Sequence, residues 1–270
     1  PCLHNYNQLF YLNKTLNKLS IQYCSDLHLE FKANENYLLQ NPLVPKAEML
    51  ILAGDILPFK LLGKPCHFVD WCAANFETTY WIPGNHEYYH FDLADVKIPL
   101  NEKIRENVIL LNNQTITYKN VELIFSTLWS HIPPQFEYTV QQSVNDFNFI
   151  KQNGKTITAK DFNALHQTDF AFFQTAFAKP TDKQRIIITH HVPTLMHYPE
   201  QYKSSNINAA FAVELFDTIE SSNATHWIYG HHHYNTSAFK IGNTTMLTNQ
   251  LGYVQTNEHK NFNHSAIIEI

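Results

Sequence analysis

The amino-acid sequence predicts an α/β fold in which buried strands alternate with helices. Two apolar runs of strand length, 48–53 and 185–189, are continuous rather than alternating, as in strands covered on both faces. Between such runs lie segments with apolar residues at helical spacing, most clearly 158–178. Five strands end at clusters of polar residues, and ligands of α/β sheets bind beyond the carboxyl ends of the strands. The sequence therefore predicts a sheet framework that gathers one functional site.

Length and composition indicate one large domain and exclude several other classes. The 270 residues are 44% hydrophobic and 16% charged, which excludes a disordered chain. Nineteen Lys and Arg against 24 Asp and Glu give 19 − 24 = −5, which argues against a broad basic surface for long nucleic acid. No apolar run approaches the roughly 20 residues of a membrane helix, and the first twenty residues lack a signal-peptide stretch. Four cysteines without a C-x-x-C pair fit a reducing compartment, so we expect a cytoplasmic protein without a membrane partner.

Local patterns predict the elements of the first third of the chain. Residues 1–17 are polar and aperiodic, so we expect an extension there and a single domain over 18–270. A helix is expected at 65–76, where Pro65 lies near the first turn and apolar residues follow at helical spacing. The expected strands of this part are 18–24, 48–53 and 79–82.

The rest of the chain resumes the same alternation after a less regular middle. Segments 114–119 and 121–127 alternate around Lys119-Asn120, which predicts an antiparallel hairpin. Segment 131–155 has little pattern, and we expect it to shape specificity. Thr158 and Asp161 predict a capped start for the helix at 158–178. The remaining expected elements are strands at 185–189, 225–229, 237–241, 244–248 and 265–270, and a helix at 208–219 whose N-terminus either holds an anion or caps a core helix.

Side chains with metal-binding chemistry follow five of the strands. They are carboxylates, imidazoles and one amide, without cysteine, a donor set that suits Mn²⁺, Fe²⁺ or Zn²⁺ better than a thiolate site would. Seven such ligands exceed what one tetrahedral ion uses, and one carboxylate shared by two ions would account for the surplus. Glycines before Asp55, Asn85 and His231 allow tight turns close to the ions. The clusters are Asp26-x-His28, Gly54-Asp55, Gly84-Asn85-His86-Glu87, His190-His191 and Gly230-His231-x-His233.

These five motifs, in this order and each closing a strand, resemble those of the calcineurin-like metallophosphoesterase superfamily. The resemblance runs from about Ile21 to Tyr253, most of the chain. Further stretches at 189–193, 208–211 and 249–253 resemble a group of small bacterial members. The fold that the resemblance implies is a two-sheet β-sandwich flanked by helices, with four layers in the order α/β/β/α and a dinuclear metal site at one edge.

The resemblance also implies a role for each motif residue. His86 would not be a metal ligand but would contact phosphate and help to protonate the leaving oxygen. Pro58 stands where a purple acid phosphatase has an iron-binding tyrosine, so no iron–tyrosinate centre is expected. The implied ligands are Asp26, His28 and His233 for the first ion, Asp55 as the bridge, and Asn85, His190 and His231 for the second ion.

The implied activity is metal-dependent hydrolysis of a phosphoric ester. The expected cofactors are two divalent ions, Mn²⁺ first, with Fe, Zn or Ni as alternatives, and the expected nucleophile is a metal-bridging hydroxide that attacks phosphorus in line. A small phosphodiester or nucleotide is the preferred substrate, because a net charge of −5 disfavours a long polyanion. The alternatives are a phosphomonoesterase, a catalytically silent binding scaffold, and a nuclease, which would require a basic groove.

Two further features have alternative interpretations. His191 either touches substrate or orients His190 from behind. Tyr88, Tyr89 and Phe91 follow the His86 loop and either stack on a nucleobase or form a packed loop, which we prefer.

Overall fold

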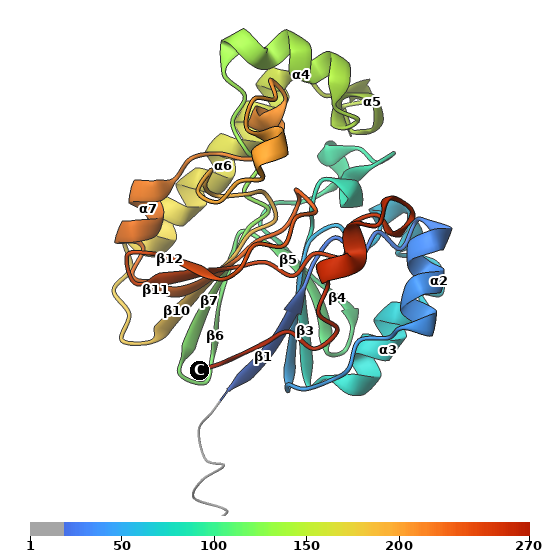
Figure 1. Cartoon of the computed structure of the whole chain (residues 1–270), viewed down its shortest axis with the longest axis vertical. Helices are drawn as coiled ribbons and strands as arrows, with labels where there is room; N and C mark the ends of the chain where they lie inside the picture. The colour runs from blue at the N-terminus through green and yellow to red at the C-terminus, as the bar shows by residue number, and fades with distance from the viewer. Residues whose placement is uncertain (1–18) are drawn as a thin grey trace, which may run out of the picture.

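The computed structural model describes residues 19–270, and the predicted extension at 1–17 lies outside the described residues. Two six-stranded β-sheets pack face to face, and helices cover the outer face of each (Figure 1). This arrangement confirms the α/β class and the four-layer sandwich that the resemblance implied. The domain boundary at residue 18 stays a prediction.

The first sheet has the strand order β14-β1-β2-β3-β5-β4. Strands β1, β2, β3 and β5 run parallel in its centre, and β14 and β4 pair antiparallel at its edges. The carboxyl ends of the parallel strands therefore lie at one edge of the sheet. The bounds are β1 Ser20–Cys24, β2 Met49–Ala53, β3 Thr78–Ile82, β4 Leu100–Arg105, β5 Val108–Asn112 and β14 Ile267–Glu269.

The second sheet repeats this plan in the order β12-β13-β11-β10-β7-β6. Its central strands β13, β11, β10 and β7 are parallel, and β12 and β6 are antiparallel edge strands. The predicted hairpin at 114–127 is confirmed as the antiparallel pair β6–β7. The bounds are β6 Gln114–Tyr118, β7 Val121–Phe125, β10 Gln184–Ile188, β11 Ala224–Ile228, β12 Phe239–Ile241 and β13 Thr244–Leu247, with a separate small hairpin of β8 Lys151–Gln152 and β9 Lys155–Thr156.

Helices α2 and α3 cover the first sheet, α6 and α7 cover the second, and α4 and α5 lie beyond the edge of the sandwich (Figure 1). The longest helix, α6, begins with the predicted capping box, in which Thr158 accepts from the Asp161 N–H and the Asp161 carboxylate accepts from the Thr158 N–H. The bounds are α2 Lys32–Gln40, α3 His67–Asn75, α4 Glu137–Ser143, α5 Asp146–Phe149, α6 Ala159–Phe177 and α7 Phe216–Ser221.

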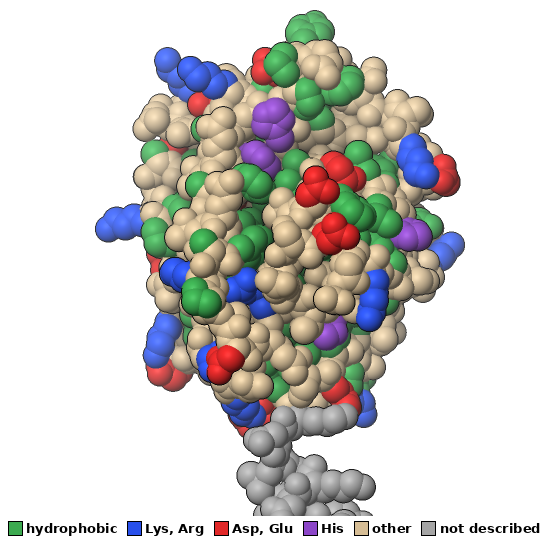
Figure 2. Space-filling view, turned by 90° about the vertical axis from the view of Figure 1, so that its left-hand side faces the viewer, with side chains coloured by type: hydrophobic (Ala, Val, Ile, Leu, Met, Phe, Trp, Pro, Cys, Tyr) green, Lys and Arg blue, Asp and Glu red, His purple; other side chains and the backbone are tan. Residues whose placement is uncertain are grey.

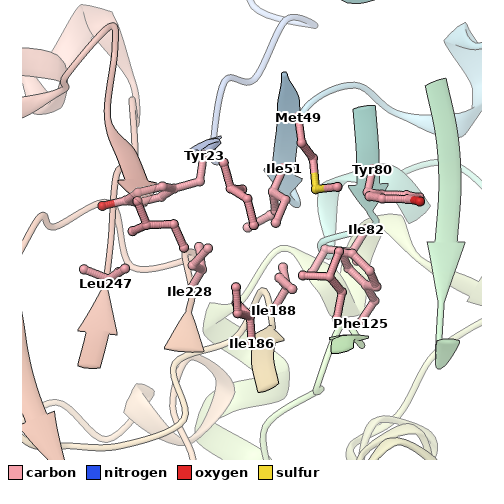
Figure 3. Close-up of a cluster of buried hydrophobic side chains, with 14 of the residues drawn as sticks. Tyr23, Met49, Ile51, Tyr80, Ile82, Phe125, Ile186, Ile188, Ile228 and Leu247 are labelled. Carbon is pink, nitrogen blue, oxygen red and sulfur yellow. The ribbon is translucent and has the colours of Figure 1, made fainter. Parts of the chain in front are cut away.

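The main core fills the space between the two sheets. Ile51 of the first sheet and Ile188 of the second are both fully buried and point into this space (Figure 3). Burial of an isoleucine side chain of this kind stabilises the fold by about 1.5–3 kcal/mol. Both sheets are also covered on their outer faces, which is why β2 and β10 are apolar without alternation.

The predicted helix at 208–219 is wrong. Residues Asn208–Ala210 form only a 3₁₀ turn, Ala212 then pairs with Val192 in a β-bridge, and α7 begins at Phe216. The Glu214 carboxylate accepts hydrogen bonds from the backbone N–H of Phe216 and from that of Leu195, so tertiary contacts replace the helical ones here. The candidate helix N-terminus at residue 208 is therefore absent.

Several elements were not predicted. Helix α2 and the strand pair β4–β5 lie in stretches whose sequence pattern is weak, and the segment 131–155 forms α4, α5 and the β8–β9 hairpin. Within residues 19–270, no helix is both long and apolar enough to cross a membrane. On the face shown in Figure 2, lysine and arginine side chains are scattered among acidic and uncharged ones.

Candidate metal centre

The five polar clusters follow five parallel strands and meet at one edge of the sandwich. Those after β1, β2 and β3 come from the first sheet, and those after β10 and β11 come from the second. The structure brings all seven predicted ligands together there: six form two groups that share Asp55, and Asn85 contacts His190 of the second group. Residues separated by some two hundred positions thus become neighbours because both sheets present the same strand ends.

The first group consists of Asp26, His28, Asp55 and His233, whose candidate ligand atoms all lie within 4.8 Å of one another. Nε2 of His28 lies 2.9 Å from Nε2 of His233 and 3.7 Å from Oδ2 of Asp55. Oδ1 of Asp26 lies 3.4 Å from Nε2 of His233. Two imidazole nitrogens that face each other at 2.9 Å need a shared proton or a cation between them.

The second group consists of Asp55, His190 and His231, again within 4.8 Å. Nε2 of His190 lies 3.4 Å from Oδ2 of Asp55 and 3.3 Å from Oδ1 of Asn85. Asp55 belongs to both groups, which is the relationship expected of a bridging carboxylate. The donor atoms are oxygen and imidazole nitrogen only, and they fit two divalent ions of the Mn²⁺, Fe²⁺ or Zn²⁺ type.

Each of the four histidines has an acceptor on the side that faces away from its group. A carbonyl or carboxylate oxygen can only accept, so it holds the proton on the nitrogen that faces it and leaves a lone pair on the other nitrogen. The imidazoles are therefore aimed as metal ligands. The pairs are His28 Nδ1–Glu30 Oε1 at 3.3 Å, His233 Nδ1–Glu258 Oε2 at 2.7 Å, His190 Nδ1–Ala53 O at 2.9 Å and His231 Nε2–Ala210 O at 3.4 Å.

The ionisation states also suit a metal site. Burial opposes ionisation of Asp55, but the positive charge of His190 holds the pKa of Asp55 well below its usual value. Burial likewise opposes ionisation of Asp26, and the hydrogen bond from His233 lowers its pKa. For His231, burial is the main cause that holds the pKa well below the usual value, so its ring is neutral. Ionised carboxylates and neutral imidazoles are the forms that bind metal. Burial lowers the pKa of His190, but the charge of Asp55 outweighs it and raises the pKa to about 9, so a metal ion would replace a proton there.

The backbone at this edge is strained. Five proposed ligands have left-handed backbone angles, a conformation that L-residues other than glycine rarely adopt. Gly54, with φ 92°, precedes Asp55, and a Cβ atom there would lie 2.3 Å from Nδ1 of His190. A side chain at position 54 would therefore displace a proposed ligand. The five φ angles are Asp26 55°, His28 48°, Asp55 56°, His231 80° and His233 51°.

His86 lies beside both groups, and each of its ring nitrogens has a polar neighbour. Its Nδ1 lies 2.8 Å from Oε1 of Glu30, and its Nε2 lies 3.4 Å from the hydroxyl of Tyr253. The ring stacks on Tyr89 with centroids 4.0 Å apart. Burial lowers the pKa of His86, but the negative charges of Asp55 and Glu30 outweigh it and raise the pKa. His86 thus lies at the wall of the cavity among charges that favour its protonated form, and with His28 and Glu30 it also forms a third group of candidate donors.

Glu87 ends the motif Gly84-Asn85-His86-Glu87, but the sequence predicts no role for it. Its buried carboxylate accepts four hydrogen bonds, from the backbone N–H of Asp55, Ile56 and Gly84 and from the indole of Trp81. It therefore joins the loops after β2 and β3 and positions the bridging residue. Its adjacency to His86 was the available signal. Glu30 has a similar signal, because it lies two residues after His28, whereas Glu258 follows no strand and lies in no motif.

A cavity of about 520 Å³ opens beside the two groups. Among the described residues that line it, Lys260 is the only Lys or Arg, and side-chain amides such as those of Asn145 and Gln201 are frequent. Segment 131–155 contributes Asn145 and Asp146 to the wall, which is consistent with the expectation that it shapes specificity. The aromatic side chains of the wall are Tyr89, Tyr198, Tyr202, Phe211, Tyr234 and Tyr253.

The cavity decides between the alternative interpretations of His191 and of the aromatic cluster after His86. His191 is fully buried and does not line it; its ring packs against that of His231 at 4.2 Å, so direct contact with substrate is not supported. Of the aromatic cluster, Tyr88 is buried against Trp129, as in the packed-loop interpretation, whereas Tyr89 lies on the cavity wall.

Comparisons with known proteins agree with this geometry. A family model described as calcineurin-like phosphoesterase matches residues 19–235. An uncharacterized protein of Acanthamoeba polyphaga mimivirus is 33% identical over 276 residues, which cover 93% of this chain and 96% of that protein. Among solved structures, the phosphopantetheinyl hydrolase of Mycobacterium tuberculosis is similar with a TM-score of 0.68 and 14% identity, over 94% of this chain and 96% of that chain.

Proposed function

The chain belongs to the calcineurin-like phosphoesterase family of metal-dependent phosphoric ester hydrolases, and we propose that it hydrolyses a small phosphodiester or nucleotide at a dinuclear metal centre. The observation that carries this proposal is the position of Asp55, which belongs to both groups of candidate ligands. One carboxylate common to two buried donor groups is what a two-ion site requires.

The proposed ligand sets follow the distances in the structure. Three residues would hold the first ion with Asp55, three others would hold the second ion with it, and the outward acceptors keep their imidazoles in the required tautomers. Two ions held there would supply polarisation of the phosphoryl group and a water molecule of lowered pKa as the nucleophile for the proposed in-line attack on phosphorus. The proposed sets are Asp26, His28 and His233 for the first ion and Asn85, His190 and His231 for the second.

The chain itself supplies the proton for the leaving group. The charges of Asp55 and Glu30 favour the protonated form of His86, and the acceptor Glu30 holds its Nδ1 at 2.8 Å, so in that form Nε2–H is the proton that it can donate. We assign His86 as the general acid for the leaving oxygen. The hydroxyl of Tyr253 lies 3.4 Å from that nitrogen, so a leaving oxygen that takes the proton would replace this contact.

The cavity supports a small substrate with a ring or polar groups beside its phosphate. Its 520 Å³ suit a small molecule, and its aromatic wall offers faces on which a base or another flat group can stack. One lysine among the described lining residues gives little attraction for a long polyanion. Phosphomonoester hydrolysis is the alternative activity at the same centre, and a catalytically silent scaffold is the alternative without turnover.

The test is hydrolysis of a chromogenic phosphodiester and the matching monoester by manganese-loaded protein. We expect turnover of the diester to be the faster, and Asp55→Asn to abolish both activities while the exposed Asp217→Asn leaves them unchanged. Nucleotides and a phosphopantetheinyl ester belong in the substrate panel, the latter because of the name of the similar solved structure. A faster monoester would replace the diesterase proposal, and two bound ions without any turnover would favour the scaffold.

A further inference from the structure

Asp146 connects segment 131–155, which follows β7 in the chain, to the proposed second ion site. It is the first residue of α5 and only 1% exposed, and its Oδ1 accepts hydrogen bonds from Nδ2 of Asn85 at 2.8 Å and from the hydroxyl of Tyr89 at 2.9 Å. It belongs to none of the five polar clusters and lies 61 positions from Asn85 in the sequence.

The hydrogen bond from Asn85 matters because the two ends of an amide side chain have nearly the same shape, and only their hydrogen-bonding chemistry distinguishes them. The oxygen has lone pairs for a cation, whereas the NH₂ group has none to offer. A carboxylate can only accept, so Asp146 holds the NH₂ end of Asn85 and turns Oδ1 toward Nε2 of His190, 3.3 Å away. Rotation of the amide would bring two oxygens together at Asp146 and turn the NH₂ group toward the ion.

Only Oδ1 of the buried Asp146 carboxylate has hydrogen-bond partners among the described residues, and these are Asn85 and Tyr89. Its Oδ2 has no hydrogen-bond partner among residues 19–270, and an unpartnered buried carboxylate oxygen opposes folding. The segment that carries Asp146 is anchored independently, because the Asp92 carboxylate accepts from the backbone N–H of Asn153 and of Gly154. The fold therefore does not need Asp146 to hold this segment in place.

We infer that Asp146 is a positioning residue that keeps the oxygen of Asn85 toward the second ion and thereby sets the affinity for that ion. The inference rests on the proposed function, since it takes Asn85 as a ligand. It assigns to α5, which lies outside the motifs, a direct effect on the metal centre.

The experiment is a manganese titration of the metal-free protein, with the number of ions and both dissociation constants measured by calorimetry. We expect two ions for the wild type and a second dissociation constant raised about 10- to 100-fold in Asp146→Leu, with the first unchanged. Asp146→Asn should restore most of the affinity, because its amide oxygen can still accept from Asn85 and Tyr89. Asp92→Ala loosens the same segment without touching Asn85 and should leave both constants unchanged.

Other outcomes of the titration would contradict either the inference or the proposed function. Equal affinities in Asp146→Leu and wild type would overturn the inference, and so would an equal loss in Asp92→Ala, because the effect would then be general loosening. Fewer than two ions in the wild type would instead remove the proposed function. If thermal unfolding shows that Asp146→Leu does not fold, Asp146→Ser, which is too short to reach Asn85, takes its place with the same expectation.

Discussion

Glu30 lies between two functional histidines: its Oε1 is 2.8 Å from Nδ1 of His86 and 3.3 Å from Nδ1 of His28. Burial opposes ionisation of Glu30, but the hydrogen bonds from His28 and His86 hold its pKa at about 2. One ionised carboxylate thus orients both the proposed general acid and a proposed metal ligand. Glu30, which orients both histidines, lies in none of the five motifs.

Glu30→Gln should lower kcat about 10- to 100-fold with little change in KM, because the neutral amide no longer favours the protonated form of His86. The assay is steady-state hydrolysis at saturating manganese, so that any weaker binding at His28 does not contribute. The same substitution in a His86→Ala background should cost less than about threefold, since the two residues act through one proton. If the losses of kcat in Glu30→Gln and His86→Ala were fully additive, Glu30 would not act through the proton of His86.

His86→Ala should retain both metal ions and slow the chemical step. The loss should reach about 10²–10⁴-fold for an alkyl leaving group, which needs the proton, and be much smaller for a nitrophenyl ester, which does not. Elemental analysis and rates for a series of leaving groups check this. Loss of a metal ion in the variant would place His86 among the ligands, as the third group of candidate donors would allow.

Glu87→Ala should lower the free energy of unfolding by at least about 3 kcal/mol, because four buried N–H groups lose their acceptor and each such loss costs about 1–3 kcal/mol before any water replaces it. Urea unfolding of the metal-free protein isolates this effect from metal binding. Glu35→Ala, on the surface of α2, is the matched control and should change stability by about 0.5 kcal/mol or less. A small loss in Glu87→Ala would mean that water satisfies these donors.

The motif residues could be predicted from sequence because each cluster directly follows its own strand. The strand ends Asp26 and His231 are 205 positions apart, yet both follow apolar runs whose carboxyl ends must lie at one edge. Asp146 and Glu258 could not be predicted, because their roles depend on contacts that only the packed structure creates. The failed helix at 208–219 has the same origin, since Glu214 bonds to a distant loop there.

Stability should also depend on pH through Asp169, away from the metal centre. Burial, only partly offset by the hydrogen bond from Asn113 at 2.7 Å, raises the pKa of Asp169 to about 6. An unfolded aspartate has a pKa of about 3.9, so between these values only the folded state holds the proton, and stability falls as pH rises. The difference in unfolding free energy between wild type and Asp169→Asn should therefore shrink by up to about 3 kcal/mol from pH 3 to pH 7, with about 2 kcal/mol of this between pH 4 and pH 6. Urea unfolding across this range checks it, and a constant difference throughout would contradict it.

Metal binding and thermal stability favour different residues at five positions with left-handed backbone, which are Asp26, His28, Asp55, His231 and His233. Glycine at any one of these positions would relieve about 1–2 kcal/mol of conformational strain and would remove a ligand at the same time. A library of variants selected only for surviving high temperature in a chelating buffer should accumulate glycine at these five codons. Activity and thermal stability therefore make opposite demands on the same five residues, and a variant can gain in one only by losing in the other.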